Sequence, residues 1–513
     1  MFDTDEVLNR AGIKPVHPGG YSGATGWLPT EGRPEFAAVN PADATTVAKI
    51  AGATAADYEE IVRFAEEAQR RWRMVPAPRR GELIDAIGDL VAQNRQTLAQ
   101  VVTLDTGKSL AEADAEIGEV IDMARLAVGQ SRMLYGFTQQ SQRDRHRMYD
   151  QWLPLGVAGI ISAYNFPAAV WAQNGFLSAI GGNTVIWKPS PKVPLTAIAL
   201  QQLANEAAAS LGHEGVFSLF IPEDNETAQL LVADPRIALV SFTGSSAVGQ
   251  LVATTVGSTL GRRYLLECSG NNGCIVDATA DLELAARSIA FGALGTSGQR
   301  CTSTRRVIVQ REVADTLVRL LGEAFDQITV GDPREAGSVI GPLIDPAALD
   351  AFDDAVTQAT RLGGSIAYGG QRLDRPGFYV QPTLITGAKP DWPCVRHETF
   401  APIVYVLTYD TLDEAIQIHN GVPQGLASGI HSTNLHAIET FLSAEGSDCG
   451  IAKVNMGTTG ADVGAAFGGE KQTGGGRTAG SDAWKGYMRR QSVCVNWSGK
   501  SPWDARITFT ASS

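Results

Sequence analysis

Apolar residues follow a helical spacing through the first part of the chain. They recur at every third or fourth position from Ile61 to Ala68 and again from Leu83 to Val91, on either side of a Pro76-Ala77-Pro78 break. Such positions lie on one face of a helix, because a turn takes 3.6 residues. The pattern therefore predicts helices across the stretch from Asp57 to Leu134.

After Trp152 the pattern changes to short β-rich runs that alternate with helical stretches. The expected strands are Val157–Ala163, Thr184–Trp187, Phe217–Ile221 and Ala238–Phe242, and the expected helices include Ala197–Ala209 and Glu226–Val232. This alternation is typical of βαβ units, which build a parallel sheet and bind ligands where its strands end. A second α/β series follows Glu267, with a strand at Arg306–Val309, a helix at Val313–Ile328 and a loop region from Gly331 to Pro346.

Two strand-like segments, Arg145–Leu153 and Gln491–Trp497, fall outside both α/β series. They suit a sheet that joins copies of the chain, although an ordinary edge hairpin is equally compatible. The 513 residues are too many for one hydrophobic core, so we expect two or three domains.

Composition narrows the class of protein. An apolar content of 44% and a charged content of 19% exclude a disordered or fibrous chain. The formal net charge of −13 argues against a nucleic-acid partner, which needs clustered Lys and Arg. The acidic start of the chain predicts no signal peptide, and no apolar run approaches the ~20 residues of a membrane span. The six cysteines include no Cys-x-x-Cys pair, so we expect no metal site and a cytoplasmic protein without disulfides.

Two features at predicted strand ends could bind a dinucleotide. Gly244 and Ser245 stand where an apolar strand gives way to a helix, whose free N–H groups and dipole attract a pyrophosphate. The alternative is plain turn chemistry, and the motif is not the usual G-x-G-x-x-G. Lys188 ends another strand, where it could reach a ribose or phosphate or could simply be solvated.

Three further residues could carry covalent chemistry. Cys301 follows Gly298-Gln299-Arg300, and we interpret this as a glycine-containing loop that leads into a helix and exposes a nucleophilic thiol. The alternative is a buried cysteine that packs as a small hydrophobe. Glu267 ends an apolar strand and could act as a general base or be an exposed strand end. The Asn165 amide could donate to an oxyanion or serve only its local turn.

The order of these motifs along the chain resembles that of the aldehyde dehydrogenase superfamily. The shared motifs are Asn165-Phe166-Pro167, Lys188-Pro189, Phe242-Thr243-Gly244-Ser245, Leu265-Leu266-Glu267, Gly298-Gln299-Arg300-Cys301 and Glu398-Thr399-Phe400. The likeness extends roughly from Pro41 to Asn496. It implies oxidation of an aldehyde with NAD or NADP, with Cys301 as the nucleophile, Glu267 as the base, and Asn165 with the Cys301 N–H as the oxyanion hole. The implied cofactor-binding residues are Lys188, Gly244, Ser245, Glu398 and Phe400.

Within the superfamily, long runs such as Ala466–Lys471 and Asp482–Lys485 are similar to the antiquitin branch, the α-aminoadipic semialdehyde (piperideine-6-carboxylate) dehydrogenases of lysine metabolism. This likeness implies that Glu119 binds the substrate's α-amino group and Arg300 its α-carboxylate. Glu119 lies in an expected helix from Ala115 to Gly129. Without the likeness, Glu119 would be interpreted as a solvated carboxylate and Arg300 as one half of an ion pair with a neighbouring loop. Further implied substrate-binding residues are Phe166, Gly460, Ala461 and Phe467.

The resemblance also implies an α/β fold with a Rossmann-like, parallel-sheet cofactor domain, an α/β catalytic domain and a small β oligomerisation extension. The expected ranges are 1–136 and 156–267 for the NAD(P)-binding domain, 268–484 for the catalytic domain, and 137–155 and 485–513 for the bridging strands. We expect a homo-oligomer, a dimer of dimers, with a small-molecule aldehyde as substrate and no nucleic-acid or membrane partner.

Two positions depart from the family pattern. Cys268-Ser269 replaces Leu-Gly after the base glutamate, which bears on how the nicotinamide is positioned. Pro191 stands where many members carry a ribose-binding glutamate, and this weakens the argument for NAD over NADP. NAD is still the expected cofactor, and NADP is not excluded. Because Glu267 and Cys268 alternate in direction along a strand, we expect Cys268 to pack away from the site rather than to pair with Cys301.

Three other functions compete with this hypothesis. The chain could oxidise another semialdehyde or an aliphatic aldehyde, pass its acyl group to coenzyme A, or be a catalytically dead structural relative. Acylating enzymes generally lack the base glutamate, and a dead relative need not keep Cys301, Glu267 and Asn165 together.

Overall fold

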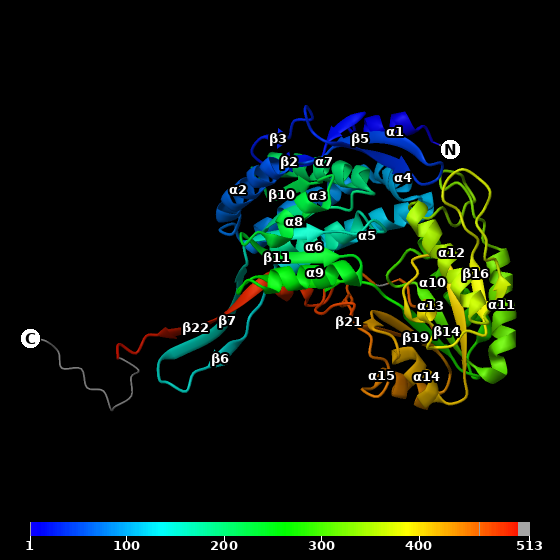
Figure 1. Cartoon of the computed structure of the whole chain (residues 1–513). Helices are drawn as coiled ribbons and strands as arrows, with labels where there is room; N and C mark the ends of the chain where they lie inside the picture. The colour runs from blue at the N-terminus through cyan, green and yellow to red at the C-terminus, as the bar shows by residue number, and fades with distance from the viewer. Residues whose placement is uncertain (1, 461, 501–513) are drawn as a thin grey trace, which may run out of the picture.

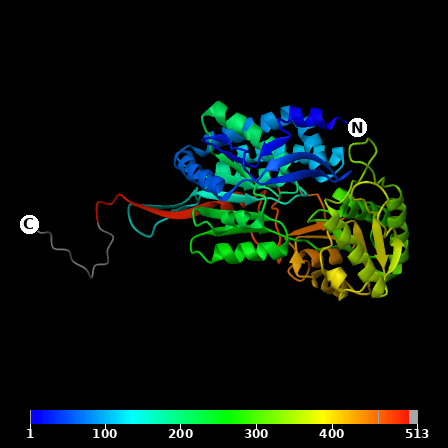
Figure 2. The ribbon, with the colours of Figure 1, turned by 45° about the horizontal axis from the view of Figure 1, so that its top comes forward.

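The computed structural model of the chain describes residues 2–460 and 462–500. Two α/β bodies lie side by side, and a narrow three-stranded sheet projects from the first (Figures 1 and 2). Among the described residues, no helix combines the length and apolar character needed to cross a membrane.

The first body is built on a seven-stranded sheet with the order β12-β11-β8-β9-β10-β2-β3. Its strands are β12 (Arg263–Glu267), β11 (Ile237–Thr243), β8 (Val157–Ile161), β9 (Thr184–Lys188), β10 (Phe217–Phe220), β2 (Gly20–Ser22) and β3 (Gly26–Trp27). β8 to β12 run parallel, and β2 and β3 add antiparallel edge strands. The chain builds outward from β8 to β10 and then returns to the other side of β8 with β11. The ends of β8 and β11 therefore flank a topological switch point, where open α/β sheets bind their ligands.

Helices cover both faces of this sheet. They are α2 (Ala55–Trp72), α3 (Ala77–Gln93), α4 (Arg95–Thr106), α5 (Leu110–Ser131), α6 (Ala169–Ile180), α7 (Pro194–Leu211), α8 (Asn225–Ala233) and α9 (Ser246–Gly257). Alternate strand residues point to opposite faces, so Ala158 and Ile160 pack with α3, α6 and α7, while Val157 and Ile161 pack with α2, α8 and α9. The helices and strands predicted from the sequence are present, and α5 confirms the helix expected around Glu119.

A second seven-stranded sheet forms the other body, with the order β15-β16-β17-β14-β13-β19-β20. Its strands are β15 (Ser365–Tyr368), β16 (Thr383–Thr386), β17 (Ile403–Tyr409), β14 (Thr304–Gln310), β13 (Asn272–Val276), β19 (Ala427–His431) and β20 (Ile451–Val454). Helices α10 (Leu282–Leu294) and α11 (Ala314–Asp326) cover one face. The other face carries α12 (Pro346–Arg361), α13 (Pro393–Arg396), α14 (Leu412–Asn420) and α15 (Leu435–Leu442). The expected loop between Gly331 and Pro346 lies between α11 and α12.

The projecting sheet contains the two segments that the sequence places outside both series. β7 (His146–Pro154) pairs antiparallel with β22 (Met488–Asn496) over their full lengths, and β6 (Thr138–Gln140) completes the sheet. The remaining elements are α1 (Thr4–Arg10), β1 (Val16–Pro18), β4 (Glu35–Asn40), β5 (Thr45–Ala51), β18 (Gln424–Gly425), β21 (Glu470–Lys471), η1 (Gly295–Gly298), η2 (Arg311–Val313) and η3 (Ala483–Tyr487). The chain returns to the first body through η3, because Trp484 and Tyr487 pack in the same core as β8 and β9.

Candidate active site

A cavity of about 1460 Å³ lies between the two bodies. The first sheet faces it with the carboxyl ends of β8, β9, β11 and β12. The second sheet faces it with residues that precede β14 and β17, and with β20 and residues after it. Thirteen of the fourteen site residues predicted from the sequence line it, and Ala461 lies outside the described residues. The thirteen are Glu119, Asn165, Phe166, Lys188, Gly244, Ser245, Glu267, Arg300, Cys301, Glu398, Phe400, Gly460 and Phe467.

At the switch point, the residues after β11 form a site that suits a phosphate group. Ser245 caps α9, since its hydroxyl accepts a hydrogen bond from the Val248 N–H. Lys188 ends β9, and among the described residues no charged group contributes to the shift in the pKa of its ammonium. Burial lowers the pKa of Lys188 to about 8. A dinucleotide cofactor fits this arrangement, because its phosphates would give the ammonium the anionic partner that the protein does not supply.

Glu267 ends β12 with a carboxylate that the protein leaves unsatisfied. Both carboxylate oxygens are buried, and neither has a hydrogen-bond partner among the described residues. Burial raises the pKa of Glu267 well above its usual range, the positive charge of Arg477 opposes this rise, and the negative charge of Glu398 adds to it. A carboxyl group with a raised pKa that lines a cavity can accept a proton from a thiol or a water molecule.

Glu398 is also buried, but the protein satisfies its carboxylate. Its Oε1 accepts hydrogen bonds from the Gly270 N–H at 3.1 Å and from Arg305 Nη2 at 3.3 Å. Burial raises the pKa of Glu398, and the charge of Arg305 opposes the rise. Phe400 lies close by, with the Arg305 guanidinium 5.2 Å from its ring centroid.

The loop that carries Cys301 joins η1 to β14. The sequence interpretation of this loop as leading into a helix is wrong, because the chain enters a strand at Thr304. Thr296 and Ser297 both adopt left-handed backbone conformations, with φ values of 52° and 55°. Non-glycine residues rarely do so, and functional sites are where such strain is commonly held in place.

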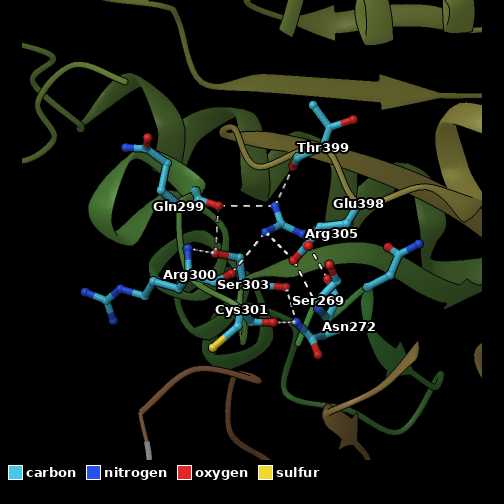
Figure 3. Close-up of polar contacts among 12 residues, drawn as sticks. Ser269, Asn272, Gln299, Arg300, Cys301, Ser303, Arg305, Glu398 and Thr399 are labelled. Atoms are coloured by element: carbon cyan, nitrogen blue, oxygen red, sulfur yellow. Dashed lines mark hydrogen bonds and ion pairs between the residues drawn. The ribbon is translucent and has the colours of Figure 1, made fainter. Parts of the chain in front are cut away.

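Hydrogen bonds to its backbone hold this loop in place (Figure 3). Asn272 Nδ2 donates to the carbonyl oxygens of Cys301 and Ser303, each at 2.8 Å. Arg305 donates to the carbonyls of Arg300 at 3.0 Å and Thr399 at 2.7 Å. The Cys301 thiol and the Arg300 side chain extend away from this network.

The Cys301 thiol is half-buried at the cavity wall. Burial raises the pKa of the thiol well above its usual range, and the carboxylates of Glu267 and Glu398 raise it further. The cysteine is therefore accessible to a ligand in the cavity, but the free protein favours its thiol form. Nucleophilic attack by this cysteine would require loss of the thiol proton.

Two charged side chains from different elements, Glu119 and Arg300, line the cavity near Cys301. Glu119 on α5 accepts a hydrogen bond from Gln173 Nε2 at 2.6 Å, and burial raises the pKa of Glu119. Arg300 forms an ion pair with Glu112 at 2.7 Å. The guanidinium lies 5.6 Å from the ring centroids of both Phe166 and Phe291. Glu119 and Arg300 thus each have a protein partner. The partner of Arg300 lies on helix α5 rather than on a loop.

Cys268 and Ser269, the two residues that depart from the family pattern, each make local contacts. Cys268 borders the cavity, but its sulfur packs so closely on α9 that a Cβ at Gly249 would collide with it. It belongs to an apolar cluster with Phe242 and Val252, and all six cysteines are free. The Ser269 hydroxyl accepts a hydrogen bond from the Ser246 N–H at 3.2 Å, which ties the end of β12 to the start of α9.

Several residues that hold the site together escape prediction from the sequence. Arg305, Asn272 and Gln299 act mainly on backbone carbonyls and N–H groups. The only available signal was a pair of arginines, Arg305 and Arg306, at the start of an apolar strand-like run.

One trio among the described residues, His419, Asp448 and Cys449, could hold a metal ion, although Asp448 is ion-paired with Lys471 at 2.7 Å.

The chain is similar to known proteins over almost its whole length. The model of the aldehyde dehydrogenase family matches residues 27–493. Aldehyde dehydrogenase family 7 member A1 of Pisum sativum is 42% identical, with 93% of each chain covered. The α-aminoadipic semialdehyde dehydrogenase of Bos taurus is 41% identical over 98% of this chain and 92% of its own length. The crystal structure of betaine aldehyde dehydrogenase from Staphylococcus aureus in complex with NAD+ is 25% identical, with a TM-score of 0.91 over 97% of this chain and 98% of that one.

Proposed function

The chain belongs to the aldehyde dehydrogenase family and uses a nicotinamide cofactor, and on that premise we propose that it oxidises L-α-aminoadipic semialdehyde, the open form of piperideine-6-carboxylate, to α-aminoadipate in lysine metabolism. One observation carries this choice of substrate. Glu119 and Arg300, an acid and a base, line the cavity that contains Cys301, together with the aromatic rings of Phe166 and Phe467. The name of the similar Bos taurus enzyme supports the same substrate.

The proposed reaction begins when the Cys301 thiol loses its proton to water in the cavity and the resulting thiolate attacks the aldehyde carbon. The new S–C bond gives a hemithioacetal oxyanion, which accepts hydrogen bonds from the Asn165 amide and the Cys301 N–H. The nicotinamide, when bound, supplies the acceptor for the hydride that leaves this carbon. Collapse of the oxyanion leaves a thioester on Cys301. Glu267 then takes a proton from water, the water oxygen attacks the thioester, and the S–C bond breaks to release the acid.

Recognition of the amino-acid end of the substrate uses the two charged residues of the substrate wall. Arg300 offers its guanidinium fork to the α-carboxylate, and Glu119 accepts hydrogen bonds from the α-ammonium. Each must share or exchange its present partner, Glu112 or Gln173, when the substrate binds. Both groups are largely withdrawn from water, so their interactions with a charged substrate are strong and selective.

We further propose that NAD is the preferred cofactor, bound by Lys188, Gly244, Ser245, Glu398 and Phe400. Pro191 lines the same end of the cavity and offers no carboxylate that would repel a 2′-phosphate. The support for NAD is the similar Staphylococcus aureus enzyme, which binds NAD+. A comparison of kcat/KM for NAD and NADP tests this preference, and a higher value for NADP would contradict it.

Assembly, location and domain division are also proposals. We propose a cytoplasmic homo-oligomer, a dimer of dimers, that forms through the sheet of β6, β7 and β22. Phe137 beside this sheet and Trp497 at its end are 63% and 58% exposed, and a second copy would cover them. The proposed NAD(P)-binding, catalytic and bridging regions keep the ranges given above. Trp484, the last residue but one of the proposed catalytic range's final run Asp482–Lys485 and the end of that range, packs in the core of the first body.

The experiment that tests the proposed function is a panel of aldehydes assayed for NADH formation. The panel pairs α-aminoadipic semialdehyde with semialdehydes of similar length that lack either the α-amino group or both α substituents. We expect the highest kcat/KM for the substrate with both charged groups. Equal values across the panel would exclude recognition of the amino-acid end and favour a general aldehyde dehydrogenase.

A further inference from the structure

A fully buried ion pair lies beneath the segment that carries Asn165. Lys108 Nζ and Glu116 Oε2 are 2.6 Å apart, and both side chains are completely withdrawn from solvent. Lys108 follows α4, and Glu116 lies in the second turn of α5. Neither residue lines the cavity, so neither can contact a substrate or a cofactor there.

Both members of the pair bind the turn that joins β8 to α6. Lys108 Nζ donates to the Asn165 carbonyl oxygen at 2.8 Å, and the ammonium lies 4.0 Å from the centroid of the Phe166 ring. Glu116 Oε1 accepts hydrogen bonds from the N–H groups of Ala168 at 2.8 Å and Ala169 at 3.1 Å. The turn is therefore held at its middle by the cation and at its end by the anion.

Stability alone is a weak reason for such a pair. Removing two charges from water costs free energy that their mutual attraction often only balances, and well-packed apolar residues can replace a buried pair at little loss. This pair is unusually well satisfied, because every hydrogen bond that it makes outside the pair goes to the turn after β8. What it supplies is a defined position for that backbone.

We propose that Lys108 and Glu116 are positioning residues that fix the Asn165 amide toward the reacting carbonyl oxygen. Lys108 holds the Asn165 peptide by its carbonyl oxygen, and Glu116 holds the start of α6. Together they prevent the turn from rotating as charge develops on the oxyanion. This inference rests on the proposed role of Asn165 in the reaction. The buried pair acts on the substrate through Asn165 and does not contact it.

The test replaces both members together, because removal of one would leave an unpaired buried charge. In the paired variant Lys108→Met with Glu116→Gln, the introduced glutamine carbonyl still accepts from Ala168 and Ala169, but the introduced methionine cannot donate to Asn165. The measurement is the rate of the first NADH burst with a simple aliphatic aldehyde, together with the Kd for the cofactor. We expect the burst rate to fall roughly 10- to 100-fold, as for a misplaced oxyanion donor, with the cofactor Kd unchanged.

A matched control removes a partly buried ion pair that touches no part of the cavity. Arg33 and Asp57, 2.7 Å apart at the start of α2, serve this purpose as Arg33→Met with Asp57→Asn. We expect this variant to keep the wild-type burst rate. If the paired Lys108 and Glu116 variant does not fold, Lys108→Arg keeps the charge while changing the donor geometry, and we expect an intermediate loss of burst rate. A wild-type burst rate in whichever variant folds would overturn the proposal.

A double-mutant cycle with Asn165→Ala separates positioning from general damage. In the Asn165→Ala background, we expect the paired variant to slow the burst less than about threefold further, because the donor it positions is already absent. An equal fall in both backgrounds would overturn the positioning role. If Asn165→Ala itself leaves the burst rate unchanged, the proposed role of Asn165 fails instead, and the positioning role fails with it.

Discussion

The two seven-stranded sheets face the same cavity with opposite ends. The first presents the carboxyl ends of β8, β9, β11 and β12. There, among the described residues, the Glu267 carboxylate has no hydrogen-bond partner, and no charged group offsets the effect of burial on the pKa of Lys188. The second presents the residues that come before β14 and β17, and there the backbone of Cys301 and the carboxylate of Glu398 are held by Asn272 and Arg305. The edge with unsatisfied groups is suited to binding a ligand and accepting a proton. The edge with satisfied groups is suited to holding a nucleophile in one place.

Among the substitutions that distinguish the two edges of the cavity, Cys301→Ala should have the largest effect on activity. This change removes the nucleophile, so we expect aldehyde oxidation to fall by roughly 10⁴-fold or more, because residual catalysis would come only from binding and the oxyanion donors. Cys301 is not among the proposed cofactor-binding residues, so the Kd for the cofactor should remain at the wild-type value. Steady-state NADH formation and cofactor titration measure the two quantities. Turnover at more than a trace of the wild-type rate would contradict the role of Cys301.

Glu267→Gln should affect the second half of the reaction and leave the first intact. We expect a burst of NADH equal to the enzyme concentration, followed by a steady state about 10²- to 10⁴-fold slower, because the glutamine cannot take a proton from water. Since the pKa of Glu267 is raised, hydrolysis by the wild-type enzyme should accelerate as pH rises through that pKa. Rapid-mixing absorbance across a pH series tests both points. A variant with an unchanged steady state would remove Glu267 from the mechanism.

Substrate selectivity should depend on Glu119 through its charge. Loss of one partner of a desolvated charge pair costs about 2–5 kcal/mol, so Glu119→Gln should lower kcat/KM for α-aminoadipic semialdehyde by roughly 30-fold to a few thousand-fold. A simple aliphatic aldehyde, which lacks the ammonium, should be far less affected. Arg300→Ala should show the same preference less cleanly, because Arg300 adjoins Cys301. Equal losses for both aldehydes after Glu119→Gln would refute the recognition of the amino group.

The smallest effect should come from Lys188 at the first edge. Its lowered pKa of about 8 means that the ammonium is present below that pH and is lost as the pH rises through it. Cofactor affinity should therefore weaken above pH 8. Lys188→Met should weaken cofactor binding roughly 10-fold, the size of one charge-assisted hydrogen bond, and abolish this pH dependence. Titration of cofactor fluorescence from about pH 6 to about pH 9.5 measures both, and an unaltered profile in the variant would contradict the role of Lys188.

The two edges also differ in how far the sequence predicts them. The residues Asn165, Lys188, Gly244 and Glu267 end apolar strands, so the rule that ligands bind at carboxyl ends of parallel strands finds them directly. That rule does not reach Cys301, which precedes its strand, and here the loop was wrongly expected to enter a helix. The prediction that Cys301 is the nucleophile depended on the order of motifs along the chain, not on the pattern of apolar residues.

The supports beneath the site could not be predicted, for a physical reason. Lys108 and Glu116 stand eight positions apart in a stretch rich in charge, where solvated side chains are the usual expectation. Their burial follows from the packing of α5 against α6 and the turn after β8, which no local pattern encodes. Arg305 similarly binds carbonyl groups far away in the chain.

The central claim is that Cys301 carries the acyl group of an amino-acid semialdehyde. The most direct test mixes the Glu267→Gln variant with NAD and α-aminoadipic semialdehyde and stops the reaction in acid after the burst. Mass spectrometry of the digested protein should find an α-aminoadipoyl group on the peptide that contains Cys301, in an amount equal to the NADH formed, and none in the double variant that also carries Cys301→Ala. NADH formation without an acyl group on Cys301, or with the group on another residue, would contradict the account.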